Sequence, residues 1–278
     1  MGRILMVAPD DGLLAALRRS PLLAEHAIDV ASAALLALRA LRTRSWDVVI
    51  TSPATSLEED LEFLEQARVA RPGVKVIALA PASSPEDVIR ALRARLFACF
   101  TPPLDPSEVA DMVARAATES DGWKDGIVVT SATRDWVTLR VNCRLLTAER
   151  LVTFFDELAG DLPEPDRDGL LLAFREILMN AMEHGGHFDP EQVVEVSAVR
   201  TARTIVYYVK DPGQGFDKSH LSHAAVSNPA DDPTAHLVAR AEAGRRSGGF
   251  GMLVARKVVD ELIYSERGNE VLLIKYRQ

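Results

Sequence analysis

Short apolar runs alternate with amphipathic stretches over the first 118 residues of the chain. The runs have the length of buried strands, and the stretches between them repeat apolar residues at helical spacing. The expected strands are Ile4–Ala8, Asp47–Thr51, Val74–Ala80 and Ala98–Phe100. The expected helices are Leu13–Arg19, Ala31–Arg44, Leu57–Ala70, Pro85–Leu96 and Pro106–Thr118. Strands that alternate with helices predict an α/β domain with a doubly wound parallel sheet of the flavodoxin-like type.

A polar, glycine-punctuated segment follows at 118–126, and it predicts a boundary between two domains, 1–120 and 121–278. Beyond it, paired strands and longer helices replace the regular alternation. The expected strands are Gly126–Ser131, Trp136–Val141, Gln192–Arg200, Thr204–Lys210, Glu261–Glu266 and Glu270–Tyr276. The expected helices are Ala148–Leu158, Pro165–His184 and Gly249–Asp260. This order predicts an α+β domain in which helices lie on a mixed or antiparallel sheet.

The amino-acid composition disfavours some classes of binding partner. The net charge of −8 disfavours nonspecific binding to nucleic acid or to an anionic membrane, because both reward a basic surface. No stretch approaches the ~18 apolar residues of a spanning helix, and the N-terminus leads directly into a strand-like run. The two cysteines, Cys99 and Cys143, stand apart from any metal-ligand spacing. We therefore expect a cytoplasmic protein without direct nucleic-acid or membrane contacts.

Acidic and amide side chains share one face of the helix expected at Pro165–His184. Glu176 and Asn180 are four residues apart, and Glu183 and His184 follow one turn later. A carboxamide oxygen can bind Mg²⁺, and a nearby carboxylate can orient or deprotonate an attacking hydroxyl or water. The alternative is a solvated polar stripe that ends in a glycine helix cap at the Gly-Gly pair that follows His184.

A second block, Asp211-Pro-Gly213-Gln-Gly215-Phe216, directly follows the apolar run of the strand expected at Thr204–Lys210. A carboxylate at the end of a buried strand can accept a hydrogen bond from the exocyclic amine of adenine, and glycines allow a backbone to approach a ligand closely. The alternative is a simple glycine-containing turn after a hairpin strand.

A third block opens the last expected helix with three glycines, Gly248, Gly249 and Gly251, followed by Met252. Free backbone N–H groups at such a helix start can hold a phosphate, although a glycine-rich opening is weak evidence by itself. The polar connection before it, Lys218–Arg246, has the length of a functional loop, and we expect its histidines to lie on the surface.

In this order, the three blocks resemble the N, G1 and G2 boxes of the GHKL ATPase superfamily, which includes gyrase, Hsp90, histidine kinases and MutL. The resemblance implies ATP and Mg²⁺ as cofactors, with Asn180 on the metal, Glu176 as the catalytic base or nucleophile orienter, and Asp211 on adenine. The connection at 218–246 would be a lid. The other residues expected to contact the nucleotide are Glu183, His184, Gly213, Gly215, Phe216, Gly248, Gly249, Gly251 and Met252.

Within that superfamily, the sequence of the helix block, Glu176 to Gly185, is most similar to that of the anti-sigma-factor serine kinases of partner-switching systems. This implies an ATP-dependent serine/threonine kinase or an anti-sigma-type switch, whose partner is an anti-anti-sigma-like antagonist or a sigma factor. Two alternatives remain: a non-catalytic ATP-dependent partner-binding module, and the catalytic half of a histidine kinase acting in trans. Autophosphorylation is not expected, because no helical hairpin surrounds His26, the single histidine before residue 184.

The first domain resembles a response-regulator receiver that has lost its phosphorylation site. The positions that match the receiver's acid pair, phosphoacceptor aspartate, hydroxyl and lysine are Ala8-Pro9, Ser52, Ala80 and Pro102-Pro103. Asp10 and Asp11 could restore one metal ligand only if the register slips by two. The resemblance predicts a pseudo-receiver that forms a homodimer or docks a partner, or that is a fused scaffold.

Overall fold

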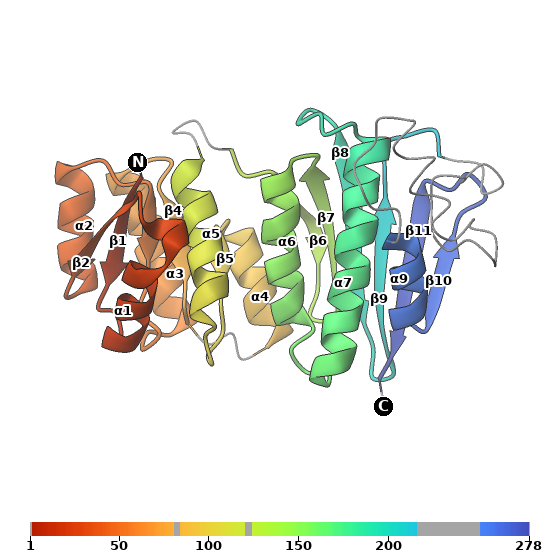
Figure 1. Ribbon diagram of the computed structural model, residues 1–278, viewed down its shortest axis with the longest axis horizontal. Coiled ribbons are helices and arrows are strands. Elements are labelled where there is room, and N and C mark those ends of the chain that lie inside the picture. The colour runs from red at the N-terminus through yellow and green to blue at the C-terminus, as the bar shows by residue number, and fades with distance from the viewer. Residues whose placement is uncertain (1, 81–83, 120–123, 216–250, 278) are drawn as a thin grey trace. The chain divides into compact units, whose positions relative to one another are not determined.

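The computed structural model describes residues 2–80, 84–119, 124–215 and 251–277. The chain divides into two compact units, Met1–Asp125 and Gly126–Gln278 (Figure 1). Each unit has its own sheet and its own buried apolar core.

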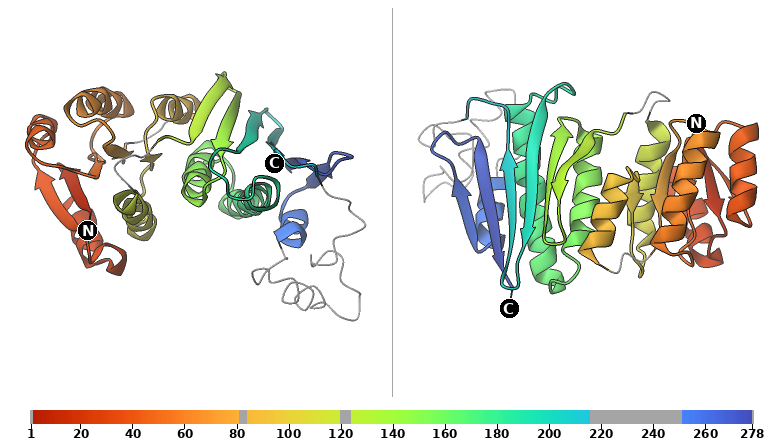
Figure 2. Two further views of the ribbon diagram at one scale, coloured as in Figure 1. Left: turned by 90° about the horizontal axis from the view of Figure 1, so that it is seen from above. Right: turned by 180° about the vertical axis from the view of Figure 1, so that it is seen from behind.

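The first unit has a five-stranded, entirely parallel sheet in the order β2-β1-β3-β4-β5. Helices α2, α3 and α4 lie on one face of this sheet, and α1 and α5 lie on the other (Figure 2). This strand order is that of the flavodoxin-like doubly wound fold, so the prediction for the first half is confirmed. The elements are β1 (Arg3–Val7), α1 (Asp11–Arg19), the 3₁₀ turn η1 (Pro21–Leu23), β2 (Ala27–Ala31), α2 (Ala34–Thr43), β3 (Val48–Ile50), α3 (Leu57–Ala70), β4 (Lys75–Ala78), α4 (Pro85–Arg93), β5 (Ala98–Cys99) and α5 (Pro106–Thr118).

One strand of this sheet is missing from the sequence-based prediction. β2 pairs with β1 alone and lies at the sheet edge, and its residues Asp29 and Val30 are exposed. An edge strand that is not buried on both faces shows no continuous apolar run, so the pattern that predicts central strands does not detect it. Helix α2 accordingly begins at Ala34, and Ala31 belongs to the strand.

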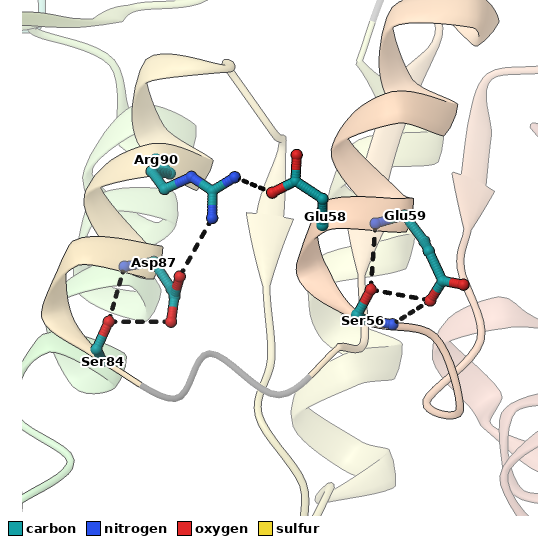
Figure 3. A network of polar contacts seen from close by, with 6 residues as sticks. All are labelled: Ser56, Glu58, Glu59, Ser84, Asp87 and Arg90. Atoms are coloured by element: carbon teal, nitrogen blue, oxygen red, sulfur yellow. Dashed lines mark hydrogen bonds and ion pairs between the residues drawn. The ribbon is translucent and has the colours of Figure 1, made fainter.

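Serine caps set the starts of two neighbouring helices in this unit (Figure 3). Ser56 caps α3 in a reciprocal capping box with Glu59, and Ser84 caps α4 by accepting a bond from the backbone N–H of Asp87. Arg90 of α4 forms an ion pair with Glu58 of α3. Exposed ion pairs of this kind contribute little to stability, so the serine caps contribute more to fixing where the two helices begin.

The corner that would hold a receiver's phosphorylation site is closed by neutral hydrogen bonds. The Ser52 hydroxyl donates to the carbonyl oxygen of Ala8 over 2.9 Å and accepts from the backbone N–H of Ala54 over 3.2 Å. The Asp10 carboxylate caps α1 by accepting from the N–H of Leu13. Among the described residues, no group of three or more histidine, cysteine or acidic side chains is placed to hold a metal ion.

The second unit has a six-stranded antiparallel sheet in the order β10-β11-β9-β8-β7-β6. Its helices α6, α7 and α9 lie together on one face (Figure 1, Figure 2). The predicted α+β sandwich is confirmed, and the sheet is antiparallel throughout. The elements are β6 (Ile127–Ala132), β7 (Trp136–Asn142), α6 (Leu145–Leu158), α7 (Glu164–Asn180), the π turn η2 (Ala181–Gly185), β8 (Val193–Arg200), β9 (Thr204–Lys210), α9 (Gly251–Val258), β10 (Glu261–Tyr264) and β11 (Glu270–Tyr276).

Three aromatic rings pack two helices of this unit, α6 and α7, onto its sheet. Phe155 of α6 stacks on Phe174 of α7 with ring centroids 4.4 Å apart, and both rings contact Tyr207 of β9. All three side chains are buried, and each such ring pair contributes roughly 0.5–1.5 kcal/mol beyond its buried area. The cluster therefore fixes α7, the helix that carries Glu176 and Asn180.

Helix α9 packs closely on α7 because Gly169 lacks a side chain. A Cβ atom at Gly169 would lie 3.2 Å from the Cβ of Val258.

Among the described residues, no helix combines the length and the apolar composition that a bilayer span requires.

Candidate functional site

The acid–amide face lies near the C-terminal end of α7. Glu176 and Asn180 are both half-buried, whereas the residues between them, Ile177, Leu178 and Met179, are buried in the core. Packing of that apolar face fixes the rotation of the helix, so the two polar side chains point away from the core. An ion pair of 2.7 Å between Arg175 and Glu149 joins the same turn of α7 to α6.

The helix does not continue regularly to His184, which corrects the predicted span Pro165–His184. After Asn180 it widens into the π turn, with the N–H of Gly186 bonded to the carbonyl of Ala181 over 3.0 Å. Glu183 is half-buried and His184 is exposed.

Gly186 is the C-cap of the π turn, but its φ of −102° is right-handed, so it does not form a left-handed glycine cap. His187 and Phe188 have left-handed φ values of 52° and 50°, and the N–H of Phe188 bonds to the carbonyl of Met182 over 2.8 Å. The described glycines with positive φ do not include Gly185 or Gly186. These two glycines instead allow close contact with neighbouring residues, Gly185 with Asp211 and Gly186 with Cys143.

Gly185 brings the end of this helix against Asp211, the residue directly after β9. A Cβ atom at Gly185 would lie 2.3 Å from Oδ1 of Asp211, closer than any side chain tolerates. Gly213 completes the contact, because its own Cβ would lie 2.8 Å from the same oxygen and 3.0 Å from the Cα of Gly185. The first two sequence blocks thus meet at one carboxylate, with no side chain between them.

The electrostatics of Asp211 suit an acceptor for a polar ligand. Burial raises its pKa, and the hydrogen bond from the N–H of Gly213 to Oδ1, 2.8 Å long, partly opposes that rise. Among the described residues, no group donates a hydrogen bond to Oδ2. An acceptor oxygen at the end of a buried strand, in a cradle that a side chain would fill, fits the exocyclic amine of adenine.

Two residues beside this carboxylate, Asn269 and Cys143, were not among the site residues that the sequence analysis predicted. The Asn269 carbonyl accepts the N–H of Asp211 over 3.0 Å, and its side-chain amide donates to the Gly213 carbonyl over 3.4 Å. Gly215 has a φ of +87°, and a Cβ there would lie 1.8 Å from the carbonyl oxygen of Arg267. Gly215 therefore serves the packing of the turn against the β10–β11 loop.

Cys143 is the second of these residues. It is buried beneath Gly186, whose Cβ would lie 2.2 Å from its Sγ. Burial, followed by the charges of Asp189 and Asp211, raises the pKa of the Cys143 thiol to about 11, so the sulfur is a neutral packing group. These supports come together only in space, and no local sequence signal marks them.

The third block lies largely outside the described residues. Phe216, Gly248 and Gly249 are among the undescribed positions, as are the connection at 218–246 and its histidines. Gly251 and Met252 are the first two residues of α9, which packs on α7. The helix ends at Val258, two residues before the predicted end, where the N–H of Asp260 pairs with the carbonyl of Ile274 in β11.

Comparison with known proteins covers both halves of the chain. Residues 143–275 match the family model of the histidine kinase-like ATPase domain. No curated protein matches the chain.

Several solved structures are similar to part of the chain. A response regulator from Thermotoga maritima is 18% identical, with a TM-score of 0.38, and the match covers 43% of this chain and 100% of that one. A CheY-like receiver domain protein from Methanospirillum hungatei JF-1 is 23% identical, with a TM-score of 0.35, covering 41% and 92%. A CpaE2 pilus assembly protein from Sinorhizobium meliloti 1021 is 17% identical, with a TM-score of 0.37, covering 41% and 98%.

Proposed function

Because residues 143–275 match the family model of the histidine kinase-like ATPase domain, we propose that this chain is a signalling regulator that binds Mg-ATP and phosphorylates a serine or threonine of a partner protein. The family implies ATP binding. The metal, the phosphoryl transfer and the acceptor are the parts that we add, and they follow from the resemblance to anti-sigma-factor serine kinases.

The contact among Gly185, Asp211 and Gly213 carries the proposal. It joins the end of the acid–amide helix to a half-buried acceptor carboxylate, and two glycines allow their backbones to contact that carboxylate with no side chain between. A simple turn after a hairpin strand would not require glycine at position 185, on a different element. The arrangement is the one that a purine site needs, with a hydrogen-bond acceptor at its base and backbone walls.

The proposed roles follow from side-chain chemistry and position. Bound Mg-ATP would supply the phosphoryl group and the positive charge that stabilises its transfer. Asn180 would offer its carboxamide oxygen to the metal, and Glu176, one helical turn earlier, would accept the proton of the acceptor hydroxyl. Asp211 would hold adenine through Oδ2. Glu183 and the glycines of the three blocks would line the remainder of the site.

Titration calorimetry with MgCl₂ and a non-hydrolysable ATP analogue tests the site. We expect wild type to bind, and Asn180→Ala to lose the Mg²⁺-dependent part of the binding. Gln66→Ala is the matched control, because it removes an exposed amide from helix α3 of the first unit and should bind like wild type. Well-folded wild-type protein that gives no binding heat would overturn the proposal.

A second measurement separates a kinase from a binding module. Partners pulled down with and without ATP are scored by mass spectrometry for phosphoserine, phosphothreonine and phosphohistidine. Loss of transfer in Glu176→Gln, with nucleotide binding retained, supports the kinase. ATP-dependent capture without transfer by wild type supports the binding module, and phosphohistidine on the partner supports a histidine kinase half acting in trans.

We further propose a cytoplasmic location and a protein partner, either an anti-anti-sigma-like antagonist or a sigma factor. The net charge of −8 supports the absence of direct nucleic-acid contacts. The pseudo-receiver supports a docking or homodimerisation role, because the closed corner at Ser52 leaves phosphorylation unavailable to it.

A further inference from the structure

One face of the six-stranded sheet carries no helix of its own unit. Helices α6, α7 and α9 cover the opposite face, and Figure 2 shows the strands lying in front of these helices when the unit is viewed from behind. Side chains alternate between the two faces along each strand. In β7, for example, Val137, Leu139 and Val141 are buried, whereas Trp136 and Arg140 are exposed.

We call the side that bears Trp136 the open face. Backbone pairing places its side chains in rows across the sheet, because residues directly opposite each other lie side by side. One row consists of the apolar residues Trp136, Val199, Val206 and Ile274 and ends at Glu261 on the edge strand β10. The next row contains Thr138, Ser197, Tyr208, Leu272 and Ile263.

These two rows have the composition of an interface core. Trp136 is 42% exposed and Ile263 is 45% exposed, although both side chains are large and apolar. Aromatic side chains are enriched and charged ones depleted at the centres of protein interfaces, and an open apolar patch of this kind marks an interaction site. Trp136 and Tyr208 thus place aromatic groups within these two rows, whereas the charged Glu261 lies on the edge strand β10.

The third row is charged, and its signs alternate. It consists of Arg140, Glu195, Lys210 and Glu270 on β7, β8, β9 and β11. Lys210 already contacts Glu270 laterally at 3.2 Å, an exposed pair that contributes little by itself. The alternation has a geometric consequence, because it makes the row complementary to its own reversed copy.

We propose that the open face pairs with the open face of a second copy of this chain, about a two-fold axis that runs parallel to the strands between β8 and β9. This axis places β8 of one copy opposite β9 of the other, and β7 opposite β11. Each row of side chains then lies opposite the same row of the second copy. Glu195 then faces Lys210 of the other copy, and Arg140 faces Glu270. In the apolar row, Trp136 faces Ile274 and Val199 faces Val206.

The charges disfavour a symmetric arrangement about the perpendicular axis. A two-fold axis running across the strands along the charged row would place each of these groups opposite itself, which costs several kcal/mol for like charges. The proposed axis satisfies every member of the row and gives an isologous interface of two aligned sheets. An unrelated protein partner would not require this self-complementarity, so the second copy is the occupant that the charges favour. The inference does not depend on nucleotide binding.

Charge reversal tests the pairing in the full chain, without nucleotide, by sedimentation velocity over a range of concentrations. We expect wild type to dimerise. Glu195→Lys and Lys210→Glu should each weaken the dimer by about tenfold or more, because like charges then face each other. Glu65→Lys, an equal charge change on the exposed side of α3, is the control and should leave association unchanged.

Mixing the two single variants gives the decisive result. In the mixed dimer, one chain has lysine at both positions 195 and 210, and the other chain has glutamate at both. Each lysine therefore faces a glutamate, so heterodimers should form with wild-type affinity or better. A purely intramolecular role for Glu195 and Lys210 predicts no rescue on mixing, since each chain keeps its own like-charged pair. The proposal is overturned if mixing gives no heterodimer, or if wild type stays monomeric at all concentrations.

Discussion

Gly185 and Asp211 touch so closely that a methyl group on the first would overlap the carboxylate of the second. The Cβ of an alanine at 185 would fall 2.3 Å from Oδ1 and 2.4 Å from Cγ of Asp211. The π turn of η2 delivers Gly185 to this position, and the hydrogen bond from Asp211 to Asn269 holds the carboxylate in place. The geometry of the proposed purine site therefore depends on one missing side chain.

Gly185→Ala should displace Asp211 and weaken nucleotide binding by more than about tenfold. We expect a loss of roughly 1–3 kcal/mol in the free energy of unfolding, the usual cost of overpacking a tight contact. Urea unfolding and calorimetry with MgCl₂ and an ATP analogue measure the two effects. Gly160→Ala is the control, because its Cβ would lie 3.3 Å from the nearest backbone oxygen. Unchanged affinity in Gly185→Ala would argue that Asp211 does not bind the nucleotide.

Asp211→Asn should separate binding from folding. The N–H of Gly213 needs an acceptor, so the amide oxygen would turn toward it and the NH₂ group would face the adenine amine, donor against donor. We expect nucleotide affinity to fall by about 10- to 100-fold, the range for a lost hydrogen bond to a charged group. Stability at neutral pH should be equal or higher, because burial raises the pKa of Asp211 and charging it is costly. Asp189→Asn, an exposed acid, should behave like wild type.

Asp60 in the first unit should make stability depend on pH. Its carboxyl is buried and contacts the hydroxyls of Thr51 at 2.6 Å and Thr55 at 2.8 Å. Thr55 has one proton and two acceptors in reach, Asp60 and the carbonyl of Ser52 at 2.6 Å, so a protonated Asp60 completes the network. Burial raises the pKa of Asp60 to about 6. The stabilisation is therefore fully present below about pH 3.8 and is lost as the pH rises through about 6.

Asp60→Asn checks this directly, because an amide copies the neutral acid. At pH 7.5 the variant should be more stable than wild type, by up to about 3 kcal/mol at ~1.4 kcal/mol per pKa unit, and below pH 4 the difference should vanish. Urea unfolding at both pH values measures it. Asp60→Ala should be destabilised at every pH, since it removes both hydrogen-bond partners. A constant difference between Asp60→Asn and wild type across this range would contradict a titrating Asp60.

Acetyl phosphate or beryllofluoride should produce no Mg²⁺-dependent change in the first unit. Ser52 cannot form an acyl phosphate, and Asp10 is already engaged in capping α1. Ser52→Asp should also remain inactive, for a different reason: Ala8 and Pro9 stand where the acid pair that holds the metal would be. Intact-mass measurement and chemical-shift mapping of residues 2–119 provide the readout. A phosphorylated species or clear shifts in this region would overturn the pseudo-receiver assignment.

Local patterns were sufficient for most of the elements. Helices α3 and α5 and strands β9 and β11 have the predicted bounds, because apolar spacing, a serine or aspartate cap, and a proline at the helix start all act within a few residues. The order of the three sequence blocks likewise indicated the ATPase family before any geometry was known. These signals are local in the chain, so the amino-acid sequence alone determined them.

The tertiary structure decided what depends on partners remote in sequence. β2 is a strand because β1 pairs with it at the sheet edge, and its own residues show no apolar run. The contact of Gly185 with Asp211, the support from Asn269 and the charge row on the open face each arise from strand register and helix packing. Periodicity records which face of an element is buried, whereas the identity of the residue lying opposite is set only when the chain folds.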